Sequence, residues 1–156
     1  MLFKPRPKGL GKENFLKLND NEEISGVFRG EIHTFKRHWV NQRSVECPGD
    51  DTCPICNVDP DNYPSFRFRI NFITTKNGEW IAKIFEGGGE LYDMLVTIDR
   101  KFDLSRTAVE ITRMGLKQNT KYSVLPRLDM PITEAMEEKL SSVSLLPLTA
   151  AIPEAA

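Results

Sequence analysis

The sequence lacks the features of a membrane protein or a secreted protein. None of its apolar runs approaches the roughly 18 residues needed to span a bilayer, so we expect no membrane partner. Residues 1–8, MLFKPRPK, lack the apolar middle of a secretory signal peptide. We therefore expect an intracellular location, in a reducing compartment where cysteines remain thiols.

The sequence also lacks a strong excess of charge and the common catalytic motifs. A net charge of −1 over 156 residues excludes a uniformly basic nucleic-acid binder, but not a protein that keeps its positive charges on one surface. There is no Gly-x-x-x-x-Gly-Lys phosphate loop, and neither histidine begins the His-x-Glu motif of a zinc deaminase. The absence of such motifs favours a protein that is not an enzyme. With 40% hydrophobic and 28% charged residues, the composition predicts one globular domain.

Only three cysteines and two histidines are present, and the cysteines are close together. All three lie between Cys47 and Cys56, and the CPIC motif at residues 53–56 has the spacing at which two thiolates reach one tetrahedral ion. The Pro-Gly pair at residues 48–49 favours a turn that folds Cys47 back onto this motif. One imidazole would complete a closed Cys3His site, so the sequence predicts a structural zinc ion.

Alternatives to this zinc site stay open. A redox pair would need a strand and a helix around the CPIC motif, which instead lies among Pro, Gly and Asp residues. Three unrelated cysteines could also cluster by chance. For the fourth ligand we favour His38, which is nearer to Cys47 and outside the regular strand pattern, over His33, which lies within that pattern.

Several segments show the period-two alternation of β-strands. They are residues 23–35, 66–72, 80–85, 107–113 and 120–125. The first contains glycines where a bulge or a bend would be placed, and Asn77-Gly78 predicts a hairpin between the second and the third. Helical spacing predicts a helix at residues 90–102 and a short acidic helix at 131–140, while Gly87-Gly88-Gly89 is interpreted as a flexible linker.

The order of three strands, a helix and two strands predicts a mainly β fold. We expect a five-stranded OB-fold barrel with a zinc-binding loop inserted between strands 1 and 2 and a helix between strands 3 and 4; an α+β sandwich with a decorated loop is the alternative. The expected organisation is a flexible basic arm at residues 1–14, an OB-fold domain at 15–127 with a zinc subdomain at about 36–64, and an acidic helix with a loosely attached tail at 128–156.

Positive charges and aromatic rings are interspersed near the metal loop and on several strands. Single-stranded nucleic acid needs cations for its phosphates and flat rings for its bases. The predicted nucleic-acid-binding residues are Lys36, Arg37, Trp39, Arg43, Arg67, Arg69, Lys83, Arg113, Lys117, Lys121 and Tyr122. Trp39 is the best stacking candidate because it lies among charges, although it could instead cap the zinc site.

Several segments resemble phage single-stranded DNA-binding proteins. They are FLKL at residues 15–18, GVFRG at 26–30, the cysteine motif at 47–56, VEITRMG at 109–115 and TKY at 120–122. The most similar type is the zinc-containing helix-destabilising protein of T-even phages and its relatives, over roughly residues 15–127. In that family an OB-fold barrel carries a Cys3His zinc subdomain, and single strands lie in a basic, aromatic cleft between the two.

The resemblance implies sequence-independent binding of single-stranded DNA in phage DNA replication, recombination and repair. It implies a zinc site formed by His38, Cys47, Cys53 and Cys56. Replication or recombination proteins are expected as partners, with self-association along the strand, and a phage protein would act in the cytoplasm of its bacterial host. The chain departs from the family in its shorter cysteine loop and in its tail, where only Glu154 is charged beyond Lys139.

A different class of function remains open. A zinc-stabilised protein-interaction or adaptor domain could carry the same metal site, with its basic residues as surface decoration that binds no nucleic acid. Binding to single strands, and its dependence on salt, separates the two hypotheses.

Overall fold

Six antiparallel strands form one sheet in the computed structural model, which describes residues 11–49 and 51–149. The strands are β1 (Glu23–Val40), β2 (Arg43–Cys47), β3 (Ser65–Lys76), β4 (Glu79–Gly88), β5 (Val109–Met114) and β6 (Lys121–Pro126). The helices are α1 (Pro54–Val58), α2 (Gly89–Phe102) and α3 (Glu134–Ser142), with short 3-10 turns η1 (Lys12–Asn14) and η2 (Lys117–Asn119). The chain is therefore mainly β, as predicted, and no described helix is long and apolar enough to cross a membrane.

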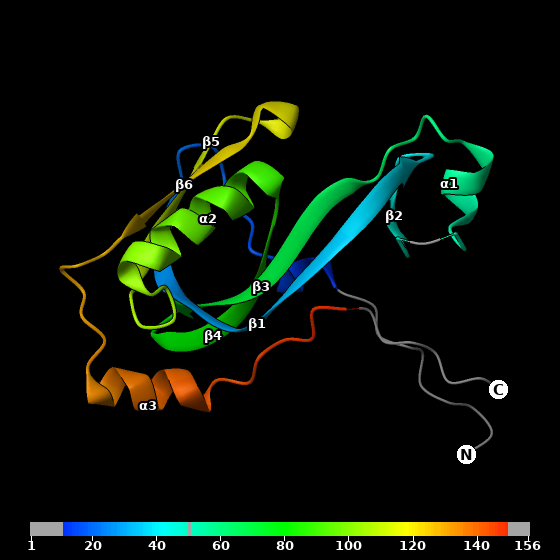
Figure 1. The fold of residues 1–156 in the computed structure, drawn as a ribbon. Helices are drawn as coiled ribbons and strands as arrows, with labels where there is room; N and C mark the ends of the chain where they lie inside the picture. Colours follow the sequence, from blue (N-terminus) through cyan, green and yellow to red (C-terminus); the bar gives the residue numbers. More distant parts are fainter. Residues whose placement is uncertain (1–10, 50, 150–156) are drawn as a thin grey trace, which may run out of the picture.

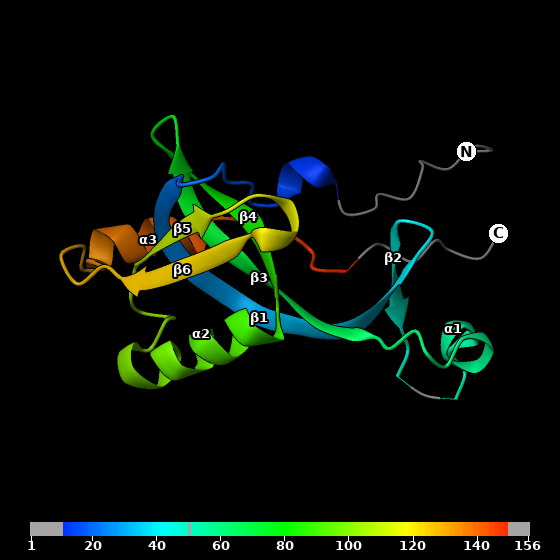
Figure 2. The ribbon, with the colours of Figure 1, turned by 90° about the horizontal axis from the view of Figure 1, so that it is seen from above.

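The two longer helices lie on opposite faces of the sheet (Figures 1 and 2). α2 covers the face that carries the first core, in which Phe68, Phe72 and Phe85 are almost fully buried. α3 covers the other face, where Leu140 packs near Ile73 in a second core. Because successive strand residues point to opposite faces, Phe72 and Ile73 are both buried only if each face is covered.

β1 is bent at Gly30, whose φ angle of +84° is a conformation that L side chains rarely adopt. Its register with β3 shifts between Arg29 and His33, which is the bulge that the glycines of this strand predicted. Beyond the bend β1 continues to Val40, five residues past the predicted end at residue 35. This extension carries the chain out of the body of the sheet (Figure 1).

The strand β2 was not predicted, so the sheet has six strands instead of five. β2 pairs with the end of β1 across a two-residue turn, in which Asn41 and Gln42 have φ angles of 50° and 63°. Its residues are exposed except for Cys47, and the strand therefore lacks the alternation by which the others were recognised. The predicted metal loop is a hairpin followed by the short helix α1.

The sheet is open and does not close into a barrel. Across the described residues, no backbone pairing joins β4 to β6, the two ends of the strand order β4-β3-β1-β5-β6. The segment before β1 lines this gap: the Leu16 amide donates to the Ile84 carbonyl at 2.8 Å, and Leu18 is buried in the first core. The rings of Phe85 and Tyr122 meet across it at 5.3 Å. Side chains, not paired strands, therefore connect β4 to β6.

The segment after β6 packs against the sheet as far as the structure describes it. α3 begins after Thr133, whose side chain accepts a hydrogen bond from the Met136 amide and caps the helix. Asn71 of β3 exchanges two hydrogen bonds with the backbone of Leu146, at 3.0 and 2.8 Å. Residues 143–149 are therefore not loosely attached, while residues 150–156 and residues 1–10 of the predicted basic arm lie outside the described residues.

The glycines at residues 87–89 belong to β4 and α2, and Gly87 is closely packed, which corrects their interpretation as a linker. Gly87 and Gly88 belong to β4, and a Cβ on Gly87 would lie 2.6 Å from Cδ2 of Leu91 and 2.9 Å from the Phe68 ring. We expect Gly87→Ala to lower the free energy of unfolding by about 1–3 kcal/mol, because the core cannot absorb an added methyl. Gly88→Ala is the matched control, since its nearest neighbour, a terminal nitrogen of Arg67, is 3.4 Å away. Chemical denaturation measures both, and equal losses would contradict the prediction.

Candidate metal centre and basic cleft

The three cysteines and His38 converge beside the β1–β2 hairpin, at the end of the molecule away from α3 (Figure 1). His38 lies within β1, not in a loop as expected, and pairs with Val45, two residues before Cys47. Because side chains alternate along a strand, His38 and Cys47 share one face of the hairpin. Cys53 precedes α1 as its N-cap, and its sulfur accepts a hydrogen bond from the Cys56 amide at 3.4 Å.

The four side chains are spaced as ligands of one ion. The sulfur atoms of Cys47 and Cys56 are 3.7 Å apart. Nε2 of His38 lies 3.4 Å from the sulfur of Cys53 and 3.3 Å from that of Cys56. In a tetrahedral zinc site, with Zn–S of about 2.3 Å and Zn–N of about 2.0 Å, sulfur atoms lie about 3.8 Å apart and nitrogen about 3.5 Å from sulfur. The cluster therefore has the dimensions of a metal site.

Residues 36–64, here called the metal lobe, have no hydrophobic core of their own among the residues that the structure describes. Among the described residues of the lobe, the buried ones are His38, Cys47 and Cys53, and all three belong to the cluster. Small domains without a core are commonly held together by metal or disulfide links. All three cysteines are free, so a bound metal ion would serve as the core of the lobe.

Asn62 orients the histidine of the cluster. Nδ1 of His38 donates to Oδ1 of Asn62 at 3.2 Å, which leaves the lone pair of Nε2 directed at the sulfur atoms, as in histidines that bind metals. The alternative ligand, His33, lies elsewhere: its ring stacks on Phe35 at 5.2 Å, and Nε2 is 3.7 Å from the Glu46 carboxylate. The structure thus brings His38 to the cysteines and leaves His33 apart.

The environment of Cys53 favours the thiolate form that binds metal. The hydrogen bond from the Cys56 backbone amide is the main cause that lowers the pKa of the Cys53 thiol to about 7. Near neutral pH a substantial fraction of this thiol is ionised, as at other amide-stabilised cysteines.

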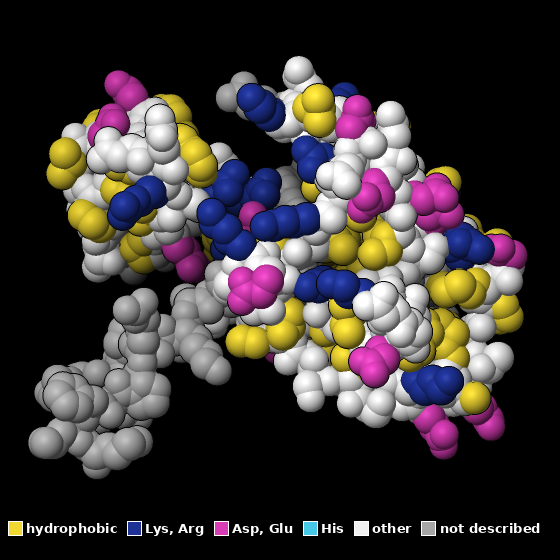
Figure 3. Space-filling model, turned by 180° about the vertical axis from the view of Figure 1, so that it is seen from behind, with side chains coloured by type: hydrophobic (Ala, Val, Ile, Leu, Met, Phe, Trp, Pro, Cys, Tyr) yellow, Lys and Arg dark blue, Asp and Glu magenta, His cyan; other side chains and the backbone are white. Residues whose placement is uncertain are grey.

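A cavity of about 740 Å³ lies between the metal lobe and the α2 side of the sheet. Figure 3 shows Lys and Arg side chains gathered in this hollow, beside the lobe at the left. We call it the basic cleft; it is lined by Arg37, Arg67, Glu86, Gly87, Gly88, Gly89, Glu90, Leu91, Met94, Arg113, Lys117, Thr120, Lys121 and Tyr122. Five cations face two carboxylates, so the cleft is positively charged.

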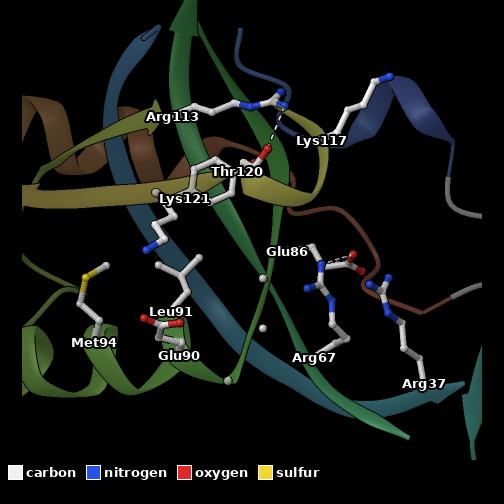
Figure 4. A pocket seen from close by; sticks show the side chains of 14 residues that line it. Arg37, Arg67, Glu86, Glu90, Leu91, Met94, Arg113, Lys117, Thr120 and Lys121 are labelled. Atoms are coloured by element: carbon white, nitrogen blue, oxygen red, sulfur yellow. Dashed lines mark hydrogen bonds and ion pairs between the residues drawn. The ribbon is translucent and has the colours of Figure 1, made fainter. Parts of the chain in front are cut away.

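The cations of the cleft come from segments far apart in the chain (Figure 4). Arg37 and Arg67 extend from β1 and β3, whereas Arg113, Lys117 and Lys121 come from β5, the following turn and β6. Burial lowers the pKa of Arg37, and the positive charge of Arg67 lowers it further. Within the described part of the chain, Lys117 and Lys121 are exposed without a hydrogen-bond or ion-pair partner. Among the residues that the structure describes, the cleft therefore carries more positive than negative charge.

Of the eleven residues predicted to bind nucleic acid, six line the cleft. These are Arg37, Arg67, Arg113, Lys117, Lys121 and Tyr122. Trp39 is next to the cleft: it is 60% exposed and lies under the guanidinium of Arg37, at 5.6 Å from the ring centroid. Lys36 and Arg43 lie on the opposite face of the hairpin, which they share with His38 and Cys47.

Two predicted residues of the β3–β4 hairpin have other roles. Arg69 is held by Glu86 at 2.7 Å, by the carbonyl of Leu148 at 3.1 Å and by the ring of Phe35, so it is a packed residue outside the cleft. Lys83 pairs with Phe72. It thus lies on the face of the hairpin opposite to Arg69, so the two cations cannot line one surface.

No match was found among known protein families, curated proteins or solved structures. The functional argument therefore depends on the metal cluster and the basic cleft. Glu86, Glu90 and Asn62 are site residues that sequence reasoning missed. The sequence does not show that Glu86 belongs to the cleft, because only the register of β3 with β4 places it opposite Arg69.

Proposed function

We propose that this protein binds single-stranded DNA, irrespective of its sequence, in the basic cleft, and acts in DNA replication, recombination and repair. The observation that supports this is the gathering of five cations in one cavity beside the apolar side chains of Leu91 and Met94. Cations can contact phosphates, and apolar or aromatic surfaces can contact bases of any kind. Trp39, exposed at the edge of the cleft, offers a stacking surface.

A single strand suits this cleft better than a duplex does. In a duplex the bases are stacked inside and the phosphates are outside, so only the cations would find a partner. A single strand can turn its bases toward α2 and Trp39 while its phosphates meet Lys117 and Lys121. Preferential binding of the single strand would shift the melting equilibrium of DNA by mass action.

Zinc is our proposal for the metal, because a closed set of three thiolates and one imidazole is typical of structural zinc sites. His38, Cys47, Cys53 and Cys56 would hold it, and the ion would supply rigidity to the lobe. Arg37 and Trp39 flank His38 on β1, so the metal would fix one wall of the cleft.

The five strands other than β2, with α2 between β4 and β5, support an OB-fold of the partly open kind. The likeness to phage helix-destabilising proteins belongs to the same proposal.

Titration with labelled oligo-dT tests the function. We expect binding that weakens with salt, with a slope of about −0.7 per phosphate contacted. Changing Lys117 and Lys121 together to Gln should reduce affinity about tenfold and make the slope shallower by about 1.4, because two phosphate contacts are lost. The matched control changes Lys76 and Lys139 to Gln, which removes the same charge at exposed positions away from the cleft.

The adaptor hypothesis makes the opposite prediction. It is favoured by exposed apolar side chains on the metal lobe, where Val58 is 84% and Tyr63 80% exposed. An adaptor should show no salt-dependent binding of oligo-dT, and its Trp39 fluorescence should not change. Equal losses in the cleft variant and in the control variant would also count against binding in the cleft.

A further inference from the structure

We infer that Glu86 limits the affinity of the basic cleft for nucleic acid by occupying Arg67, a guanidinium that would otherwise contact a phosphate; this inference rests on the proposed function. Glu86 projects from β4 and is 19% exposed. One carboxylate oxygen accepts a hydrogen bond from Nη2 of Arg67 at 3.0 Å, and the other accepts one from Nε of Arg69 at 2.7 Å. Figure 4 shows Glu86 beside Arg67, with Arg37 nearby.

The two arginines bound by Glu86 differ in what else holds them. Arg69 also donates to the carbonyl of Leu148 and lies over the Phe35 ring at 4.3 Å. Arg67 lines the cleft, and in the described part of the chain Glu86 is its one hydrogen-bond partner. Nε of Arg67 is buried without any partner there. Arg67 therefore has hydrogen-bond donors that no described residue uses, and it lies in the cleft, where phosphates are expected to bind.

The positive charges around Glu86 keep it ionised, so that it competes with phosphate for Arg67. This single carboxylate faces Arg37, Arg67 and Arg69. Burial and the charge of Arg67 lower the pKa of Arg37, and the negative charge of Glu86 raises it in part. Burial works to raise the pKa of Glu86, but the hydrogen bonds from both arginines outweigh it, and the pKa lies below its ordinary value. Glu86 is thus ionised near neutral pH and competes with phosphate for the donors of Arg67.

Removing the charge of Glu86 should release Arg67 for contact with phosphate while Arg69 keeps its position. Gln has the same shape and keeps an oxygen that accepts from Arg69, which the Leu148 carbonyl and the Phe35 ring also hold. We therefore expect Glu86→Gln to bind fluorescein-labelled oligo-dT roughly three- to tenfold more tightly than the unchanged protein. The salt slope should steepen by about 0.7, the contribution of one more phosphate.

Fluorescence anisotropy with the full chain measures both quantities. The matched control is Glu79→Gln, which removes the same charge from an exposed position at the other end of β4. Unchanged or weaker binding by Glu86→Gln, or an equal gain in the control, would overturn the inference. If the unchanged protein binds no oligo-dT, the proposed function itself fails and the inference with it.

A second test leaves Glu86 in place and so does not depend on the folding of that variant. Because Glu86 already occupies Arg67, Arg67→Gln should weaken binding less than twofold, whereas Lys121→Gln removes a cation without a partner and should weaken it more. A third test combines the two changes: in the Arg67→Gln background, the gain from Glu86→Gln should disappear. A larger loss from Arg67→Gln than from Lys121→Gln would show that Arg67 already contacts phosphate, which contradicts the inference.

Discussion

Removal of the metal is expected to unfold the metal lobe while the sheet and its two cores stay folded. The buried side chains that the structure describes in residues 36–64 belong to the candidate metal cluster. Without an ion, the pairing of β1 with β2 and a few exposed hydrogen bonds would remain, and these do not replace a core. Structural zinc contributes about 10–16 kcal/mol of apparent binding free energy in small zinc-finger peptides, where it also replaces a core. The body has independent cores around Phe72 and Ile73, and local unfolding of a weakly held unit does not require the rest to follow.

Cys56→Ser should reproduce this effect in a protein that has never been exposed to a chelator. We expect loss of bound metal and rapid proteolysis within residues 41–64. Oligo-dT affinity should fall by about 5- to 150-fold, because stacking on Trp39 is worth roughly 1–3 kcal/mol per base. Far-UV circular dichroism should change little. The control is Val58→Ser, an exposed position on the same short helix. An equal resistance to protease with and without metal would contradict the prediction.

The metal cluster could be predicted because its determinants are local. Cys53 and Cys56 lie at the start of α1, and Cys47 precedes Cys53 by only six residues. The strands that alternate, β3 and β4 above all, were also predictable. On β3 the alternating apolar side chains point to the face that α2 covers, and Arg67, Arg69 and Asn71 point to the other face. β2 was missed for the converse reason, because it buries no face and so shows no periodic pattern. Its two-residue turn beginning at Asn41 was the available signal.

The basic cleft could be predicted only in part, because its determinants are not local. Alternation places Arg67 and Arg69 on one face of β3, but it cannot show that Phe35 and the backbone of Leu148 cover one of them and leave the other at the cavity. Likewise, whether the strands close into a barrel depends on the gap between β4 and β6, which the buried Leu18 helps to fill. Such contacts join residues far apart in the chain, and no period in the sequence encodes them.

Arg69→Glu is expected to destabilise the whole body of the sheet, in contrast to what the sequence pattern suggests. Taken as an outward cation, Arg69 could be reversed in charge with a loss of DNA binding alone. In the structure its side chain is only 17% exposed and is held at 2.7 Å by Glu86, which is itself 19% exposed. A glutamate at this position would place two carboxylates together in a largely buried site, and it would also release the Leu148 carbonyl.

We expect Arg69→Glu to lower the free energy of unfolding by about 3–5 kcal/mol, the usual loss when a buried ion pair is broken from one side. The melting temperature should fall by roughly 10 °C for a chain of this length. Arg67→Gln is the control, since it removes the other partner of Glu86 but leaves the Glu86–Arg69 pair intact, and its melting temperature should fall by less than a third as much. Calorimetry on the two variants decides between the roles. Because Arg69 also holds the backbone of Leu148, faster proteolysis after residue 143 should accompany the loss of stability. A stable Arg69→Glu variant with unchanged proteolysis of this segment would contradict the prediction. It would show that Arg69 does not hold the sheet and the C-terminal segment together.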